Sequence, residues 1–284
     1  MTAQHIRRLA GARVGVPDPA ATAAFLADGL GFACAEGDGV VRVICAGDYG
    51  SRGQVAIELV EHPGLELLRA RFALGSGTLE ELEAVLAAAG VEHDRDAGGL
   101  HFSDPAGNRL SVEPGDAALT DLPPANPLRP RRLGHVNMKA PAPPVAAAFY
   151  REILGMRLSE QIGEALFFLR LGSEHHSVGL RPGGRGELHH LAFEVAGWHV
   201  YQPILDRLAA LELQVEYGPG RHAPGNSIFT YVCDPSSGLR IELFAEMGRI
   251  ADDASYEPVR WEAGARLTKT LNLWGPQPPE SFLA

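Results

Sequence analysis

Three residues in the second half of the chain are of the types that hold a catalytic metal ion. His135, His190 and Glu242 each lie in a short apolar segment that alternates as a strand does. Two imidazoles and one carboxylate are the ligands that bind non-haem Fe(II) on one face and leave neighbouring coordination positions open. Open positions would let the metal bind a substrate and O2 together. The pattern predicts an oxygen-activating metal centre that holds Fe(II), with Mn(II) as the alternative.

An internal repeat relates the two halves of the chain. Residues 9–32 align with residues 133–156, and both segments read as a strand, a proline-containing turn and a helix that ends at Leu-Gly. Residues 104–113 align with residues 234–243, and both read as a turn followed by an alternating strand. Such self-similarity predicts that the two halves share one supersecondary design.

Only the second copy of the repeat carries the three ligands. In the first copy the matching positions are Gly11, a residue near Arg69, and Ser111. These three residues are not a set of metal ligands. We therefore expect the second half to hold the metal and the first half to be a degenerate, metal-free copy.

A second duplication within each half predicts the fold class. A helix over residues 79–89 recurs over residues 200–211, so each half contains two strand-helix-strands units. We expect an α+β fold of tandem βαβββ modules, with each half curling into a half-open barrel. The expected domains are residues 1–121 and 133–284, joined by the proline-rich linker 122–132. The segment after about Glu246 is expected to wrap the second domain.

Bulk composition excludes several classes of partner. The chain has 284 residues, enough for two domains, and a net charge of -10, which argues against nucleic acid and anionic membranes. Its three cysteines have no metal-binding spacing and form no evident disulfide framework. No apolar run is long enough to span a membrane, and no signal peptide is recognised. The expected location is the cytoplasm.

Several further motifs follow one another in a fixed order along the second half. His176 lies in Glu174-His-His-Ser-Val, and His190 lies in His189-His-Leu-Ala-Phe. Gly218-Pro-Gly-Arg-His ends at His222, and nine residues further on comes Tyr231. Together with His135 and Glu242, this order resembles the type I extradiol ring-cleavage dioxygenases of the vicinal oxygen chelate superfamily. The resemblance covers most of the chain and is strongest from His135 to Glu242.

The resemblance implies a role for each site residue. His176 would act as acid-base, because a histidine pKa lies near working pH. His222 and Tyr231 would hydrogen-bond the deprotonating substrate hydroxyl. Asn137 shares a strand face with His135 and would line the site, and Phe168 would wall the substrate pocket.

The function implied is extradiol cleavage of a catechol by O2 at Fe(II), which gives a ring-opened semialdehyde in the catabolism of aromatic compounds. The family also implies a homo-oligomer. Two alternatives remain: a glyoxalase-like isomerase of the same superfamily, and a metal-free small-molecule binding protein. Metal content and O2 consumption would separate the three.

Several positions leave questions open. Relatives that act on homoprotocatechuate have an arginine where this chain has Tyr217, which implies a substrate without a carboxylate. One extra residue after Asp234 leaves Glu246 as the alternative to Glu242. His175 and His189 are expected to be packing residues or hydrogen-bond partners. The glycine-rich stretch that starts at Arg181 is interpreted as a flexible loop.

Overall fold

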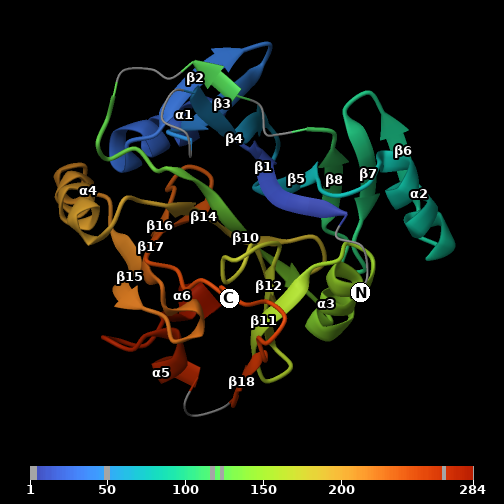
Figure 1. The fold of residues 1–284 in the computed structure, drawn as a ribbon. Helices are drawn as coiled ribbons and strands as arrows, with labels where there is room; N and C mark the ends of the chain where they lie inside the picture. The colour runs from blue at the N-terminus through green and yellow to red at the C-terminus, as the bar shows by residue number, and fades with distance from the viewer. Residues whose placement is uncertain (1–4, 48–51, 116–118, 122–124, 264–266, 284) are drawn as a thin grey trace.

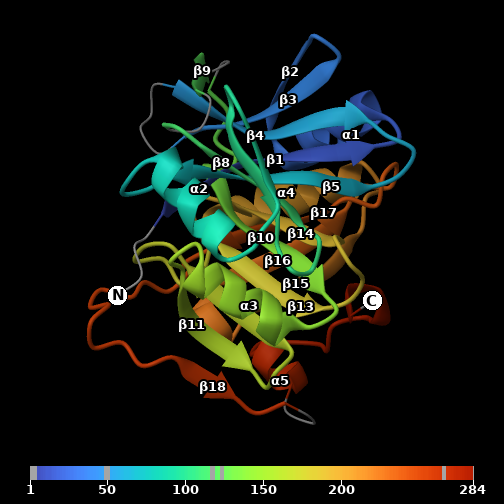
Figure 2. The ribbon, with the colours of Figure 1, turned by 90° about the vertical axis from the view of Figure 1, so that its right-hand side faces the viewer.

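Two curved mixed sheets form the framework of the protein (Figures 1 and 2). The computed structural model describes residues 5–47, 52–115, 119–121, 125–263 and 267–283. The first sheet contains β1 to β9, and the second contains β10 to β18. The two sheets therefore follow the two halves of the sequence repeat, and the predicted α+β class is confirmed.

Each sheet consists of two modules of one strand, one helix and three strands. The first half comprises β1 (Ile6–Val16), α1 (Pro19–Ala24) with a following π-helical turn (Phe25–Gly29), β2 (Ala33–Gly37), β3 (Val40–Cys45) and β4 (Arg52–Glu61), then β5 (Glu66–Leu74), α2 (Leu79–Ala88), β6 (His93–Asp96), β7 (Gly99–Ser103) and β8 (Arg109–Glu113). A short β9 (Leu119–Asp121) is added on β4. The second half comprises β10 (Arg132–Ala140), α3 (Pro143–Glu152), β11 (Arg157–Ile162), β12 (Leu166–Arg170) and β13 (Val178–Pro182), then β14 (Leu188–Glu194), α4 (Trp198–Ala210), β15 (Val215–Arg221), β16 (Ile228–Cys233) and β17 (Arg240–Ala245).

Strand pairing follows the same rule in all four modules. The first and last strands of a module pair in parallel, as β1 does with β4 and β10 does with β13. The two modules of a half then join through one antiparallel pair, β1 with β5 or β10 with β14. The outermost strands of each sheet, such as β2 and β6, do not pair with each other. Each half is therefore a half-open barrel, as the repeat predicts.

Local sequence signals account for the helix boundaries. Asp18 caps α1 by accepting a hydrogen bond from the Ala21 amide, and Pro19 occupies the first turn. The glycines of the two Leu-Gly pairs, Gly31 and Gly155, have φ values of 79° and 75°, a conformation that only glycine adopts freely. No helix among the described residues is long and apolar enough to cross a membrane.

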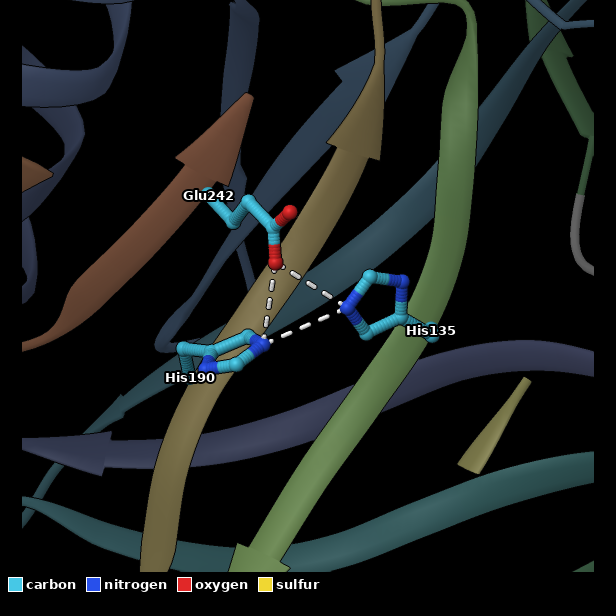
Figure 3. Close-up of side chains that lie close together, drawn as sticks. All are labelled: His135, His190 and Glu242. Atoms are coloured by element: carbon cyan, nitrogen blue, oxygen red, sulfur yellow. Dashed lines mark hydrogen bonds and ion pairs between the residues drawn. The ribbon is translucent and has the colours of Figure 1, made fainter. Parts of the chain in front are cut away.

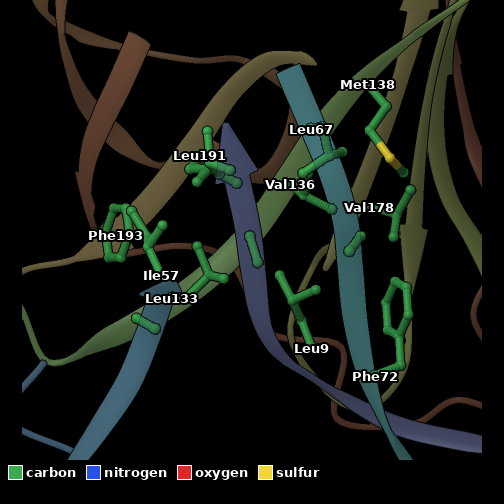
Figure 4. Close-up of a cluster of buried hydrophobic side chains, with 14 of the residues drawn as sticks. Leu9, Ile57, Leu67, Phe72, Leu133, Val136, Met138, Val178, Leu191 and Phe193 are labelled. Carbon is green, nitrogen blue, oxygen red and sulfur yellow. The ribbon is translucent and has the colours of Figure 1, made fainter. Parts of the chain in front are cut away.

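One hydrophobic core fills the space between the two sheets (Figure 4). Leu9, Ile57 and Phe72 from the first sheet are buried against side chains of the second sheet. The partners on that side include Leu133, Val136, Met138, Val178, Leu191 and Phe193. The first half thus stabilises the face of the second sheet that lies opposite the predicted metal ligands.

Two reciprocal hydrogen bonds also connect the halves. Thr22 of α1 donates to Asp234 at 2.6 Å, and Tyr150 of α3 donates to Asp104 at 3.1 Å. Asp104 and Asp234 are equivalent positions of the repeat, each at an Asp-Pro turn. All four side chains are buried, so each bond joins polar groups that are removed from water.

The C-terminal segment lies along the second half of the protein. It supplies β18 (Val259–Trp261), which pairs in parallel with β11, and the short helices α5 (Leu267–Leu271) and α6 (Glu280–Leu283). Phe282 of α6 is buried in an aromatic cluster with Tyr217, Phe229 and Tyr231. The end of the described chain therefore lies against β15 and β16, beside the site described next.

Candidate metal centre

The three predicted ligands converge on one face of the second sheet (Figure 3). His135 is on β10, His190 on β14 and Glu242 on β17, and these strands are neighbours. Ala192 pairs with His135 on one side and with Glu242 on the other, whereas His190 pairs with Asn137. Residues at alternate positions of a strand share a face, so the ligands project together. Nε2 of His135 lies 3.2 Å from Nε2 of His190, and each lies 3.1 Å from Oε2 of Glu242.

The spacing of these atoms fits donors that surround a single metal ion. Neighbouring ligand atoms around a metal ~2.1 Å away lie about 3.0 Å apart in octahedral coordination and about 3.4 Å apart in tetrahedral coordination. The observed separations are 3.1 and 3.2 Å. Two imidazole nitrogens and one carboxylate oxygen are donors suited to Fe(II) and Mn(II). The residues therefore fit the metal that the sequence predicts.

Burial and mutual contact set the protonation of the triad. Burial lowers the pKa of His190 to about 4, so its imidazole is neutral at neutral pH. Burial acts to raise the pKa of Glu242, but the adjacent His135 and His190 rings hold that pKa well below its usual range. A neutral imidazole and an ionised carboxylate are the forms that bind a divalent cation. These two ligands therefore need no deprotonation before metal binding at neutral pH.

The triad opens into a cavity of about 240 Å³. Five further side chains that the sequence predicts for the site line this cavity: Asn137, Phe168, His176, His222 and Tyr231. Hydrocarbon side chains form much of the remaining wall, among them Ile162, Leu166, Pro224 and Leu271. A small cluster of polar groups inside an apolar pocket is typical of a site for an aromatic small molecule.

Asn137 presents an unsatisfied acceptor in this cavity. Its side chain is buried, and its Oδ1 has no hydrogen-bond partner among the residues that the structure describes. Gly179 of β13 makes room for it, because a Cβ at that position would lie 2.4 Å from Asn137 Nδ2. Buried polar atoms are rarely left unpaired, so this oxygen is placed to accept a hydrogen bond from a bound molecule.

His222 and Tyr231 form a hydrogen-bonded pair that lines the same cavity as Glu242. Nδ1 of His222 lies 2.6 Å from the carbonyl oxygen of Leu271 and must donate to it, because a carbonyl only accepts. Nε2 of His222 is then the acceptor for the Tyr231 hydroxyl, 3.1 Å away. Burial lowers the pKa of His222, and burial together with Glu242 raises the pKa of Tyr231 well above its usual value. Tyr231 therefore keeps its proton and is a donor.

His176 lies next to the three candidate ligands without joining their group. Its ring centroid is 4.2 Å from that of His135 and 5.1 Å from that of Phe168. Its Nδ1 lies 2.9 Å from Nδ1 of His175, which leaves Nε2 for the cavity. Burial lowers the pKa of His176 well below its usual value, so the resting imidazole is neutral and can accept a proton.

Arg181 and the C-terminal helix α6 are parts of the wall that the sequence did not predict. The expectation of a flexible loop from Arg181 onward is wrong at its start, since Arg181 and Pro182 complete β13. The guanidinium donates to the main-chain oxygens of Phe282 at 3.2 Å and Leu283 at 3.0 Å. Burial lowers the pKa of Arg181 to about 10. The alternating segment Val178–Pro182 could have indicated a strand, but nothing local links it to carbonyls at the far end of the chain.

Two of the questions left open by the sequence receive structural answers. The Glu246 side chain is 51% exposed and pairs with Arg221 at 2.7 Å, so it is not the alternative ligand. Tyr217 does not line the cavity. It is buried behind Tyr231, with ring centroids 6.0 Å apart. The Tyr217 side chain therefore does not face the cavity, and the expectation of a substrate without a carboxylate stays a prediction.

The first half has no equivalent of the triad among its described residues. Arg13 pairs with Arg69 as Asn137 pairs with His190, so Arg69 stands at the second ligand position. Ser111 stands at the third position, because it pairs with Arg71 as Glu242 pairs with Ala192. Ion pairs occupy this face instead, with Arg71 bound to Glu58 and Glu113. Within the described part of the chain, only His135, His190 and Glu242 bring three potential ligands together.

Comparisons with known proteins agree with this architecture. The sequence model of the Glyoxalase/Bleomycin resistance protein/Dioxygenase superfamily matches residues 132–243. Metapyrocatechase 2 of Cupriavidus necator is 30% identical over 241 residues, which are 75% of this chain and 73% of that protein.

Solved structures with the same fold carry more than one activity in their names. Homoprotocatechuate 2,3-dioxygenase of Arthrobacter globiformis superposes with a TM-score of 0.87 at 22% identity, over 100% of this chain and 92% of that one. The Mn(II)-bound glyoxalase of Novosphingobium aromaticivorans superposes with a TM-score of 0.84 at 22% identity, over 98% and 94%. At such identities these structures establish the fold alone. The 30% identity to Metapyrocatechase 2 is what shows the family within this superfamily. The chain belongs to the extradiol ring-cleavage dioxygenases of the vicinal oxygen chelate superfamily.

Proposed function

We propose that this protein cleaves the ring of a catechol with O2 in a reaction that depends on Fe(II), with Mn(II) as the alternative metal. The observation that carries the proposal is the buried triangle of His135, His190 and Glu242, which opens into a cavity with His176, His222 and Tyr231. In the overall reaction the carbon–carbon bond beside the diol breaks, and both atoms of one O2 enter the product. The ring-opened semialdehyde thus contains every atom of the catechol and of the O2, and no further reactant is consumed.

The metal would supply acidification of the bound catechol hydroxyls and a position for O2. In the resting site the Tyr231 hydroxyl donates its one proton to Nε2 of His222, which the carbonyl of Leu271 fixes as an acceptor. With substrate bound, that hydroxyl would turn from His222 to donate to the substrate oxygen that loses its proton, since burial keeps the phenol protonated. Preorganised donors of this kind stabilise developing negative charge.

His176 is proposed as the acid-base residue. Its neutral ring can accept a substrate proton at Nε2 and return that proton later to a departing oxygen. The ring lies against His135 and Phe168, so its position is fixed by packing. Asn137 would accept a hydrogen bond from the substrate, and Phe168 would pack against the aromatic ring.

The cavity favours a substrate without a carboxylate. Arg181 is the only Lys or Arg side chain among the described lining residues. Its guanidinium is already used by the main-chain oxygens of Phe282 and Leu283. A substrate carboxylate would therefore be buried without a free cationic partner, which is costly. An unsubstituted, alkyl or aryl catechol is consistent with the apolar wall.

The organisation of the whole protein is also proposed. We divide it into an N-terminal domain of residues 1–121 without a metal, a linker of residues 122–132, and a C-terminal catalytic domain of residues 133–284. A homo-oligomer is supported by the exposed apolar side chains Trp198, Leu273 and Trp274, since such groups often mark contact surfaces. A cytoplasmic location is supported by Cys34, Cys45 and Cys233, which form no disulfide within the described part of the chain.

Anaerobic reconstitution followed by O2 uptake tests the proposal. The metal-free protein would be loaded with Fe(II) and then mixed with catechol, 3-methylcatechol or 2,3-dihydroxybiphenyl in buffer containing O2. We expect one O2 consumed for each yellow semialdehyde formed, and none with the Glu242→Ala variant. Bound iron without O2 uptake on any catechol would refute ring cleavage, and isomerisation of a hemithioacetal without O2 would identify a glyoxalase-like enzyme. Failure to bind any metal would favour a binding protein.

A further inference from the structure

Two pairs of adjacent histidines surround the metal centre in the same manner. In each pair the inner histidine lines the site, as a ligand in His190 and as the proposed acid-base residue in His176. The outer histidine precedes it in sequence. Nδ1 of His189 lies 2.6 Å from Nδ1 of His190, and Nδ1 of His175 lies 2.9 Å from Nδ1 of His176. All four rings are buried, so each of these nitrogen pairs must share one proton to satisfy both partners.

A main-chain carbonyl indicates which histidine of the first pair donates the hydrogen bond between them. Nε2 of His189 lies 2.8 Å from the carbonyl oxygen of Phe282, which can only accept, so Nε2 carries the proton. A neutral imidazole that is protonated at Nε2 has an acceptor at Nδ1. His190 must then donate from Nδ1, which leaves the lone pair of Nε2 directed at the metal position.

Arg181 also affects which nitrogen of His189 carries the proton. Its Nη1 contacts both His189 Nε2 and the Phe282 oxygen. Donation from Arg181 to His189 Nε2 would reverse the order of protons and place a hydrogen on Nε2 of His190, where it would block metal binding. The Phe282 oxygen opposes this reversal because it offers an acceptor 2.8 Å from His189 Nε2 and 3.2 Å from Arg181 Nη1. The C-terminal helix α6 is thus connected to the proposed ligand His190 by hydrogen bonds through the imidazole of His189.

A carboxylate takes the place of the carbonyl in the second pair. Nε2 of His175 lies 3.3 Å from Oε1 of Glu160, in ion-pair contact, without the angles of a hydrogen bond. Oε2 of Glu160 accepts a hydrogen bond of 2.6 Å from the indole of Trp261. This environment favours the proton on Nε2 of His175, so that His176 donates from Nδ1. Nε2 of His176 is then free to accept a proton in the cavity.

We infer that His175 and His189 are positioning residues that fix the tautomers of His176 and His190. Phe282 and Glu160 supply the acceptors that orient them, from the tail and from β11 respectively. The part that concerns His190 requires only that the triad bind a divalent metal. The part that concerns His176 rests on the proposed function.

The tautomers can be measured directly without any turnover. Histidine labelled with ¹⁵N in the protein loaded with diamagnetic Zn(II) gives long-range ¹H–¹⁵N spectra that distinguish a protonated Nδ1 from a protonated Nε2. We expect Nδ1–H for His176 and His190, and Nε2–H for His175 and His189. The reverse pattern in either pair would overturn the inference for that pair, whether or not the protein cleaves catechols.

A matched pair of variants tests the effect on metal binding. Asparagine and leucine have nearly the same size, but only asparagine offers an acceptor near the position of the histidine Nδ1. His189→Leu should weaken Fe(II) binding about 10- to 100-fold, the usual effect of removing a hydrogen-bond partner of a metal ligand. His189→Asn should stay close to the wild-type affinity. Equal losses in both variants would reduce His189 to a packing residue, and no loss in His189→Leu would refute the inference.

The same design at the second pair separates positioning from metal binding. His175→Leu should lower kcat roughly tenfold while leaving Fe(II) affinity unchanged, with His175→Asn restoring much of the rate. Glu160→Gln should shift the His176 resonances toward a mixture of tautomers. Loss of Fe(II) affinity in His175→Leu would contradict the assignment. Wild-type protein that binds Fe(II) but cleaves no catechol would instead count against the proposed function alone.

Discussion

Acidification of the metal-free protein offers a quantitative test of how the site is built. Burial lowers the pKa of His190 to about 4, against 6.5 for an ordinary histidine. As pH falls below about 6.5, the unfolded chain takes up a proton at this residue before the folded protein does. The unfolded state therefore binds more protons throughout this window. Stability must fall as pH falls, and the loss is complete only below the folded pKa.

The size of the effect follows from the shift. The difference of 2.5 pKa units between 6.5 and 4 corresponds to ~3.4 kcal/mol at most, at ~1.36 kcal/mol for each unit. At about pH 5, roughly 2 kcal/mol of this would already be lost. His176, His189 and His222 are shifted in the same direction by burial, so the whole protein should lose more than His190 contributes.

Urea unfolding of the chelator-treated protein at neutral pH and at about pH 5 measures this loss. The control is His190→Gln, which keeps a similar volume without the titrating group. The free energy of unfolding of wild type should fall by roughly 2 kcal/mol more than that of the variant between the two conditions. Parallel pH dependence in the two proteins would show that His190 titrates as an ordinary histidine and would refute the buried, neutral ligand.

Three further predictions address the site and the thiols. His176→Ala should retain Fe(II) but lose ~100-fold or more in kcat, the usual scale of general acid-base catalysis, and full activity by O2 uptake would refute the acid-base role. Glu242→Ala should lose bound Fe(II) in a metal analysis after desalting, whereas retained iron would contradict Glu242 as a ligand. Burial raises the pKa of the Cys34 thiol to about 11, so iodoacetamide at mildly alkaline pH should label Cys34 far more slowly in the folded protein than in urea. Equal rates in the two states would contradict its burial.

The repeat made the fold and the ligands predictable. Two copies of one pattern indicated the modules, and the contrast between His135 and Gly11 indicated which half holds the metal. Strand alternation then placed Asn137 beside the ligands. The backbone register assigns Arg69 to the position in the first half that matches the second ligand. The repeat alone placed this position only near Arg69.

Long-range contacts explain what the sequence could not predict. Phe282 reaches His189 across 93 residues, and Arg181 reaches Leu283 across 102. Neither contact leaves a local periodicity, and a short helix near the chain end has no signature that links it to a metal ligand. Tyr217 shows the converse case. Its position in a motif indicated the substrate side, but packing against Tyr231 places it behind the cavity wall.

Oxygen isotope incorporation tests the central claim most directly. The Fe(II)-loaded protein would cleave a catechol under ¹⁸O2, and the product would be reduced at once to stop exchange of the aldehyde oxygen with water. Mass spectrometry should show two ¹⁸O atoms in each ring-opened product, with no product from Glu242→Ala. A product that contains one labelled oxygen or none, or an unopened ring, would contradict extradiol cleavage by this site.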